Sequence, residues 1–203
     1  MLSGFRRRMA LPRPYRLVQT AVGSAQLWRW FVDSQLLPLQ PNRILDIGCG
    51  PSDILAYLPD HIDYVGIDPH APYVDAAQQR YGSRGRWLVQ SATETTGRTL
   101  GDFDVVLLLG VLHHCSDANA MELLKQAQSV LTEGGTVLHL DGCLHPNARW
   151  LETMLYRLER GFYVRDGAGY ASLMQGAYGH AVQIFQDGLL RVPYRYCVGK
   201  HTF

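Results

Sequence analysis

A short apolar stretch that ends in an acid and a glycine turn carries the strongest chemical signal in the chain. Residues 44–51 read ILDIGCGP, so Asp46 closes the apolar stretch, and Gly48, Cys49 and Gly50 form the turn. Glycines at such a turn let the backbone approach a ligand closely, and the N-terminus of a following helix favours an anionic group. An acid at the strand end can hold an ammonium group. The two features together suit a zwitterionic amino-acid tail better than a pyrophosphate.

A second acid, Asp68, closes the next apolar stretch along the chain, which covers residues 62–67. In dinucleotide-type sites, an acid about 20 residues after the glycine turn binds the hydroxyls of a ribose. Pro69 follows directly, and an Asp-Pro pair is also a common way to open a turn. Because both acids occur in register, we favour the ribose-binding role for Asp68.

Two further motifs follow in order. Ser91 and Ala92 come after a short apolar stretch, and residues 103–114 read FDVVLLLGVLHH. With residues 44–51 and 64–69 and the LTEGG turn at 131–135, these motifs resemble the class I S-adenosylmethionine-dependent methyltransferase family, in its small-molecule branch. The resemblance covers residues 43–141. The chain departs from the family at Ser52, where a third glycine is frequent, and at Ser91, where an acid is frequent.

The resemblance implies S-adenosyl-L-methionine as the cofactor. Asp68 would bind both ribose hydroxyls, and Leu109 and Gly110 would line the methyl-donor pocket through their backbone. The Ser91 hydroxyl or the Ala92 backbone would contact the adenine, although a serine that caps a helix is an equal alternative. The full set of predicted cofactor-binding residues is Asp46, Gly48, Cys49, Gly50, Asp68, Pro69, Ser91, Ala92, Leu109 and Gly110.

Methyl transfer from a sulfonium is an in-line displacement in which the protein mainly positions the acceptor. A hydroxyl acceptor also needs a general base, and histidine is the usual one near neutral pH. His114 is our first candidate, followed by His113 and His145, because all three follow predicted strands at the ligand-binding edge. His139 lies within a predicted strand, so we expect a buried histidine with satisfied hydrogen bonds. We expect no metal site.

Strands that alternate with helices predict a doubly wound α/β fold. We expect a seven-stranded, mostly parallel sheet with one antiparallel strand, as in the Rossmann-like methyltransferases, an N-terminal helix and a helical insertion after strand five. The predicted strands are 43–47, 62–67, 87–89, 103–109, 136–140, 182–185 and 195–198, the last two antiparallel to each other. The predicted helices are 24–37, 53–57, 72–80, 117–131 and 150–160, with Asp117 as an N-cap.

We expect a single methyltransferase domain over residues 1–203. It would comprise an arm and helix (1–40), a cofactor-binding core (41–141), a substrate-side insertion (142–180) and closing strands (181–203). The 203 residues suit one domain with a sizeable core.

The net charge of +1 argues against nucleic-acid and membrane partners. Four scattered cysteines indicate a reducing compartment and, with no signal-peptide pattern, a cytoplasmic location. We expect a monomer or homodimer.

The sequence leaves the acceptor open. By resemblance, we expect a small molecule, with a hydroxyl the favoured acceptor group, on a natural product, a sugar or a lipid-linked compound. The alternatives are an NAD-dependent oxidoreductase, which would share the glycine turn and Asp68, and a cofactor-binding protein that has lost catalysis. A nucleic-acid methyltransferase is disfavoured, because the chain has no Asn/Asp-Pro-Pro-aromatic motif after the fourth strand.

Overall fold

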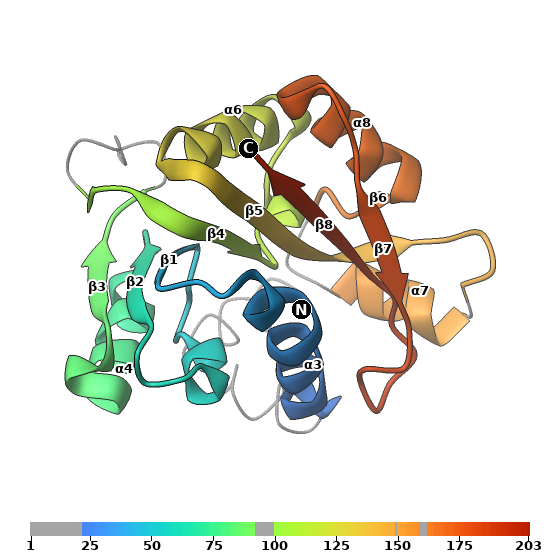
Figure 1. The fold of residues 1–203 in the computed structure, drawn as a ribbon. Coiled ribbons are helices and arrows are strands. Elements are labelled where there is room, and N and C mark those ends of the chain that lie inside the picture. The colour runs from blue at the N-terminus through green and yellow to red at the C-terminus, as the bar shows by residue number, and fades with distance from the viewer. Residues whose placement is uncertain (1–21, 92–99, 149, 159–161) are drawn as a thin grey trace.

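Apolar stretches of the chain pair into a sheet whose order is β3-β2-β1-β4-β5-β8-β7 (Figure 1). The computed structural model describes residues 22–91, 100–148, 150–158 and 162–203. The strands are β1 (Arg43–Ile47), β2 (Asp63–Asp68), β3 (Arg86–Val89), β4 (Phe103–Leu109), β5 (Leu131–Leu144), β6 (Arg165–Asp166), β7 (Gln183–Gln186) and β8 (Tyr196–Thr202). β8 runs antiparallel to its neighbours β5 and β7, and the two-residue β6 pairs with β5. The expected seven-stranded, mostly parallel sheet with one antiparallel strand is confirmed.

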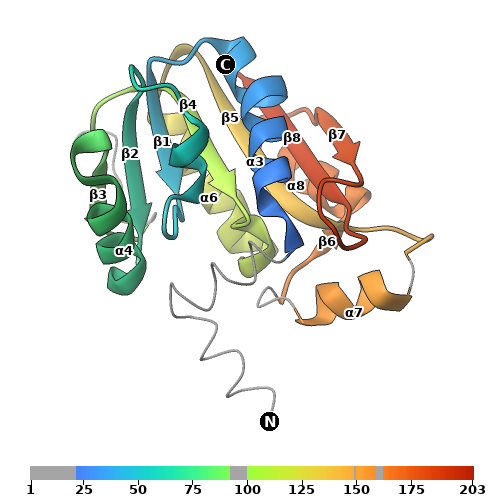
Figure 2. The ribbon, with the colours of Figure 1, turned by 90° about the horizontal axis from the view of Figure 1, so that it is seen from below.

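Helices cover both faces of the sheet, as Figure 2 shows from below. They are α3 (Ser24–Phe31), α4 (Ala71–Tyr81), α6 (Asp117–Ser129), α7 (Trp150–Leu158) and α8 (Gly167–Tyr178). Successive side chains of a strand point to opposite faces. Ile44 and Tyr64 therefore pack with α3 and α4, whereas Leu45 and Val65 pack with α6 and α8. Two buried layers follow, as a doubly wound fold requires.

Two predicted helices end differently from expectation. α3 stops at Phe31 and continues as a π-helical turn, Val32–Leu36, and a 3-10 turn, Leu37–Leu39. Pro38 has no amide hydrogen to donate, which prevents a regular α-helix from reaching it. The predicted helix at 53–57 is a 3-10 helix, Asp53–Tyr57.

The start of α6 corrects a second expectation. Ser116 is the N-cap, because its Oγ accepts a hydrogen bond from the Asn119 amide at 3.4 Å. Asp117 instead lies in the first turn, where its carboxylate forms an ion pair with Arg165 at 2.7 Å. The prediction that Asp117 caps the helix was wrong, because Ser116, one residue earlier, has both the hydroxyl and the non-helical backbone that a cap needs.

The carboxyl-terminal half follows the expected order with shifted boundaries. β5 begins at Leu131, before the Gly134–Gly135 turn, and not after it, because Leu131 already pairs with Phe103 of β4. The predicted closing strands are β7 and β8, paired antiparallel as expected. The predicted arm at 1–16 lies outside the described residues. In the part of the chain that the structure describes, no helix is both long and apolar enough to cross a bilayer.

Candidate active site at the carboxyl edge of the sheet

The glycine turn between β1 and the 3-10 helix is fixed to the neighbouring strand. Gly48 and Gly50 have positive φ angles of 72° and 52°, which favour glycine. The amides of Gly48 and Cys49 both donate to the Ile67 carbonyl, at 2.8 and 3.1 Å. A side chain on Gly48 would also overlap Val111. The turn is therefore a rigid surface of backbone at the carboxyl edge of β1 and β2.

Ser52 takes the position at which the resembled family often has a third glycine. Its φ angle of 55° lies in the left-handed region, which a glycine would adopt with less strain. The side chain is fully buried, and its Oγ accepts a hydrogen bond from Trp87 Nε1 at 2.8 Å. The hydroxyl ties the turn to β3, so the departure from the family motif has a structural use that the sequence did not indicate.

Asp46 is a buried acid with one unused oxygen. Its Oδ2 accepts a hydrogen bond from the Tyr64 hydroxyl at 2.6 Å, and its Oδ1 is buried with no partner. Burial raises the pKa of Asp46 from its usual 3.8 to about 7, against the lowering effect of the Tyr64 bond and with a further rise from the charge of Asp68. A buried carboxylate oxygen without a partner is costly, and an ammonium group would satisfy it. Tyr64, which the sequence analysis missed, is the residue that orients this acid.

Asp68 spans the turn from the end of β2. Its Oδ2 accepts from the Gly50 amide at 3.0 Å, and its Oδ1 accepts from the His70 amide at 2.8 Å. The side chain is nearly buried, whereas Pro69 and His70 are exposed. Oδ2 keeps a second lone pair for a ribose hydroxyl, whereas Oδ1 also lies 3.2 Å from His70 Nδ1, so the exposed His70 ring would have to turn away before a second hydroxyl could bind there.

The remaining predicted cofactor residues lie along the same edge. Cys49 is buried against Gly66, where an added side chain would overlap the thiol. Leu109 ends β4, and Gly110 follows with a φ angle of 71°, its amide donating to the Leu140 carbonyl at 2.7 Å. Ser91 is half-buried just past β3. Ala92 lies outside the described residues.

His113 pairs with an acid that the sequence analysis did not assign. His113 Nδ1 lies 2.8 Å from Asp141 Oδ1, and the His113 amide donates to the same oxygen at 3.1 Å. Asp141 is fully buried near the carboxyl end of β5, just past the predicted strand at 136–140. Burial alone would raise its pKa, yet the pKa is lowered because the contacts with His113 and His139 outweigh the burial. An acid at a strand end, the pattern already seen at Asp46 and Asp68, was the available signal.

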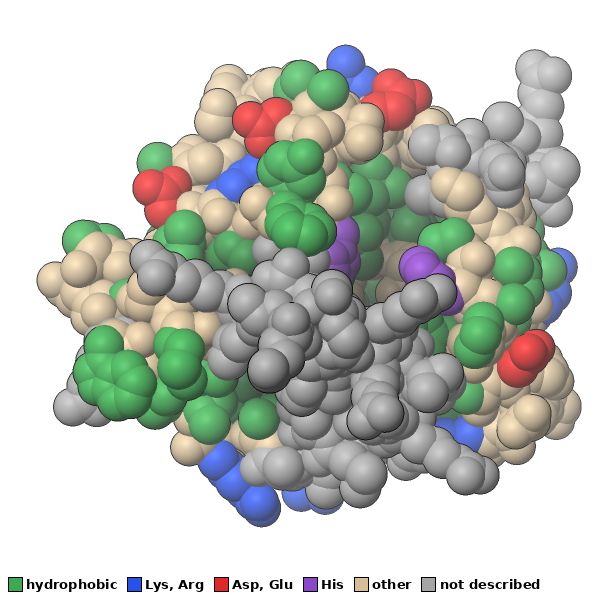
Figure 3. Space-filling view, turned by 180° about the vertical axis from the view of Figure 1, so that it is seen from behind, with side chains coloured by type: hydrophobic (Ala, Val, Ile, Leu, Met, Phe, Trp, Pro, Cys, Tyr) green, Lys and Arg blue, Asp and Glu red, His purple; other side chains and the backbone are tan. Residues whose placement is uncertain are grey.

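The other histidines have different surroundings. His114 is exposed, and its ring centroid lies 4.2 Å from that of His113. His139 is fully buried as predicted, but neither of its ring nitrogens has a hydrogen-bond partner, so the expectation of satisfied bonds was wrong. His139 Nδ1 lies 3.6 Å from Asp141 Oδ2, just beyond hydrogen-bond range. Figure 3 shows histidine side chains on the walls of a hollow whose floor is hydrophobic.

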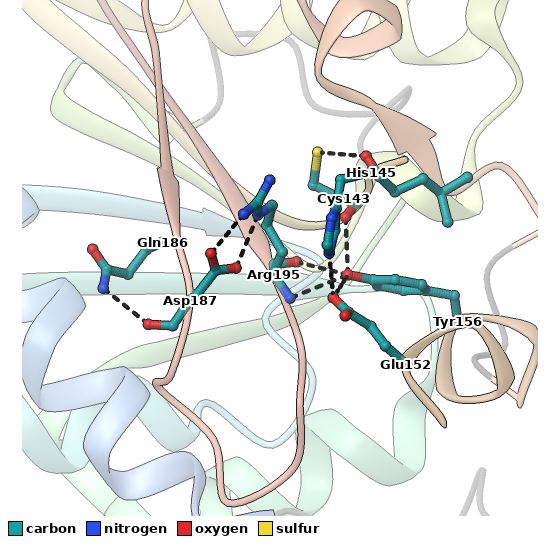
Figure 4. A network of polar contacts seen from close by, with 8 residues as sticks. Cys143, His145, Glu152, Tyr156, Gln186, Asp187 and Arg195 are labelled. Carbon is teal, nitrogen blue, oxygen red and sulfur yellow. Dashed lines mark hydrogen bonds and ion pairs between the residues drawn. The ribbon is translucent and has the colours of Figure 1, made fainter. Parts of the chain in front are cut away.

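His145 forms a second pair with a carboxylate, on the substrate side. Its Nε2 lies 2.8 Å from Glu152 Oε1, which also accepts from the Tyr156 hydroxyl at 2.9 Å. Figure 4 shows these side chains converging between α7 and the ends of β5 and β8, where the Tyr156 hydroxyl also donates to the Cys143 carbonyl. Glu152 and Tyr156 lie one helical turn apart, but the sequence did not indicate their partner. The pair fastens α7 to the chain that follows β5.

A cavity of about 280 Å³ lies at the opposite, amino edge of the sheet. Its lining includes Asn42, Asp104 and Lys200. Asp104 Oδ2 already accepts from the amides of Asn42 and Arg43, each at 2.8 Å. Ligands of parallel α/β sheets bind outside the carboxyl ends of the strands, so we place the functional site at Asp46 and not at this cavity. Among the described residues, no cluster of three or more potential metal ligands is present.

Comparisons with known proteins show what kind of domain the chain resembles. Residues 44–135 match the family model described as a methyltransferase domain. The malonyl-[acyl-carrier protein] O-methyltransferase of Legionella pneumophila is 33% identical over 131 residues, which are 63% of this chain and 42% of that protein. A phosphoethanolamine N-methyltransferase of Triticum aestivum is 29% identical over 167 residues, 80% of this chain and 32% of that protein. The chain spans less than half the length of these curated relatives.

Solved structures share the fold. The plantazolicin methyltransferase BpumL, crystallised with a triazolic desmethylPZN analogue and SAH, superposes with a TM-score of 0.69 at 14% identity, over 93% of this chain and 88% of that one. The sheet order and this likeness show the Rossmann-like fold of the methyltransferases, and residues 44–135 match a methyltransferase domain. The comparisons do not favour the oxidoreductase alternative.

Proposed function

We propose that this chain binds S-adenosylmethionine at the carboxyl edge of β1, β2 and β4 and promotes methyl transfer to a small-molecule hydroxyl. The observation that carries the proposal is the buried, unpartnered Oδ1 of Asp46 beside a rigid glycine turn. The α-ammonium group of the cofactor would satisfy this oxygen, and the ribose hydroxyls would bind Asp68. Ser91 and Ala92 would lie at the adenine, and Leu109 and Gly110 at the methyl donor.

The cofactor supplies an electrophilic methyl group, and the chain supplies the base that takes the acceptor's proton. We assign this role to His113 and rank it above His114, because Asp141 fixes its ring. The tautomer that donates from Nδ1 to Asp141 presents a lone pair at Nε2 for the acceptor proton. His114 is exposed, and His145 is directed by Nε2 at Glu152.

The relatives and structural neighbours support an oxygen acceptor on a small or carrier-linked molecule. The Legionella relative is an O-methyltransferase, and the neighbour NcsB1 is an O-methyltransferase solved with 1,4-dihydroxy-2-naphthoic acid. The wheat relative methylates nitrogen by its name, which keeps an amine as the second candidate. We further propose that the protein works in the cytoplasm as a monomer or homodimer, without nucleic acid or membrane.

Replacing Asp68 with alanine should weaken binding of S-adenosylhomocysteine by at least about 10- to 100-fold, because even one charge-assisted hydrogen bond contributes about 1.5–3 kcal/mol. Isothermal titration calorimetry of the wild type and the variant measures this, with NAD(H) as the competing ligand. Asp75→Ala, an exposed acid on α4, is the matched control and should bind as the wild type does. Binding of NAD(H) without S-adenosylhomocysteine, or binding of neither, would refute the proposed cofactor. Cofactor binding without turnover on any acceptor would instead indicate a protein that has lost catalysis.

The affinity for S-adenosylhomocysteine should fall about tenfold from pH 8 to pH 6, because the ionised form of Asp46 is the one that pairs with an ammonium group. The pKa of about 7 in the free protein places the change in this window, with binding lost as the acid takes up its proton. Calorimetry at pH 6, 7 and 8 gives the profile, and the heat in buffers of different ionisation enthalpy should show a proton released on binding at pH 6. A flat profile would exclude Asp46 as the partner of the ammonium group.

A further inference from the structure

Several buried polar atoms without a partner lie behind His113, on the sheet face that α6 and α8 cover. Among the described residues they are Asp141 Oδ2, both ring nitrogens of His139 and Nε2 of His201. Each such atom costs about 1–3 kcal/mol when it is left without a hydrogen bond. Their clustering on β5 and β8, next to the proposed base, calls for a role that offsets this cost.

His139 faces Asp141 from the same strand. The two residues are separated by one position on β5, so their side chains point to the same face. His139 Nδ1 lies 3.6 Å from Asp141 Oδ2, and neither atom has another partner. The opposite oxygen, Oδ1, is the one that holds His113. The carboxylate is therefore placed between two imidazoles, one on each oxygen.

A glycine on the neighbouring strand makes room for the His139 ring. Gly199 pairs with His139 across β5 and β8, and a side chain at position 199 would overlap the imidazole. Glycine weakens the interior of a strand, and it often marks a place where another group approaches closely. Tyr170 of α8 closes the site from outside, with its ring centroid 5.7 Å from that of His139. The histidine thus occupies a space that fits it.

We propose that His139 is a positioning residue that shares Asp141 with His113 and keeps the carboxylate aligned on the base. A small movement brings Nδ1 of His139 into hydrogen-bond range of Oδ2, which fixes the carboxylate plane and leaves Oδ1 directed at His113. This inference rests on the proposed function, because it gives His113 the role of base.

The other groups around this cluster do not neutralise the Asp141 carboxylate, so its charge acts mainly on His113 and His139. Burial, followed by the charge of Asp141, raises the pKa of Cys115 and of Tyr170, so both are neutral at pH 7. Burial lowers the pKa of His201 to about 4, with His139 and His180 adding to the effect, so His201 is neutral as well. The titratable or charged residues that face the cluster are His114, Cys115, Arg165, Tyr170, His180, Cys197 and His201.

Arg165 is the cation in this set, and it is engaged with Asp117 at 2.7 Å. Without His139, the negative charge of Asp141 should act on His113 alone, which makes His113 harder to deprotonate.

The test is an NMR titration of the His113 ring in the purified protein, which needs no acceptor. We expect His139→Leu to raise the pH midpoint of His113 by about one pH unit, a tenfold change in proton affinity. His139→Asn places an amide N–H where Nδ1 lies and should restore the wild-type midpoint. The surface variant His61→Asn is the control. If His139→Leu does not fold, His139→Gln, whose amide reaches the place of Nε2, serves as the loss variant.

An unchanged His113 midpoint in the loss variant would overturn the inference, as would equal midpoints in the loss variant and His139→Asn. The inference and the proposed function fail separately. If the His113 midpoint shifts in His139→Leu but His113 variants still methylate at the wild-type rate, His139 does act on His113, and His113 is not the base. If His113 variants lose turnover but the His113 midpoint is unchanged in His139→Leu, His113 is the base, and the proposed effect of His139 on it is wrong.

Discussion

Asp46→Asn should lower the affinity for S-adenosylhomocysteine by about 100-fold or more while making the free protein more stable. The amide keeps the shape of the side chain and can still accept the Tyr64 hydroxyl hydrogen bond, but it cannot pair with an ammonium group. Removing one partner of a buried ion pair costs about 3–5 kcal/mol, which exceeds a 100-fold loss. Calorimetry gives the affinity, and thermal unfolding at several pH values gives the stability.

The stability effect has a definite direction with pH. The pKa of Asp46 is raised from 3.8 to about 7 on folding, so the folded protein binds the proton more tightly than the unfolded chain between these values. Stability from this group therefore falls as the pH rises from about 4 to about 7, by up to about 4 kcal/mol. Asp46→Asn removes this loss, and its gain in Tm should be larger at pH 8 than at pH 5. Asp75→Asn is the exposed control, and an equal loss of stability at both pH values would contradict the account.

The parts of the fold that the sequence predicted are those that depend on short-range patterns. Apolar stretches bounded by glycines and acids located the seven strands to within a few residues. The failures were local. The cap of α6 moved from Asp117 to Ser116, and the extent of β5 moved to Leu131, because both depend on contacts with residues far along the chain.

The residues of the candidate site also fall into those that a short-range sequence pattern identifies and those that it does not. Asp46 and Asp68 could be identified because each closes a strand at a fixed distance from the glycine turn. Tyr64 could not, because its contact with Asp46 follows from the parallel pairing of β1 with β2. Asp141 is 28 positions from His113 and meets it only once β4 and β5 are paired. Side-chain partners across strands depend on register, which a single sequence does not contain.

His113→Gln should reduce the turnover of a hydroxyl acceptor by about 10²–10⁴-fold, the usual contribution of a general base. Glutamine keeps a polar side chain of similar length in the buried space but cannot take the proton. Because His113 is assigned to the acceptor and not to the cofactor, S-adenosylhomocysteine should bind with nearly unchanged affinity. Release of S-adenosylhomocysteine with a panel of phenols, hydroxy acids and alcohols measures turnover, and calorimetry measures binding.

Three matched variants separate the candidate bases. His114→Gln removes the exposed neighbour and His145→Gln removes the partner of Glu152, whereas His61→Gln changes a surface histidine. If Asp141 orients the base, the loss of turnover should be largest for His113→Gln, and the acid limb of the pH–rate profile should disappear with it. A larger loss in His114→Gln would show that the base is the exposed ring of His114. A larger loss in His145→Gln, with Glu152→Gln equally impaired, would move the proton transfer to the pair on α7.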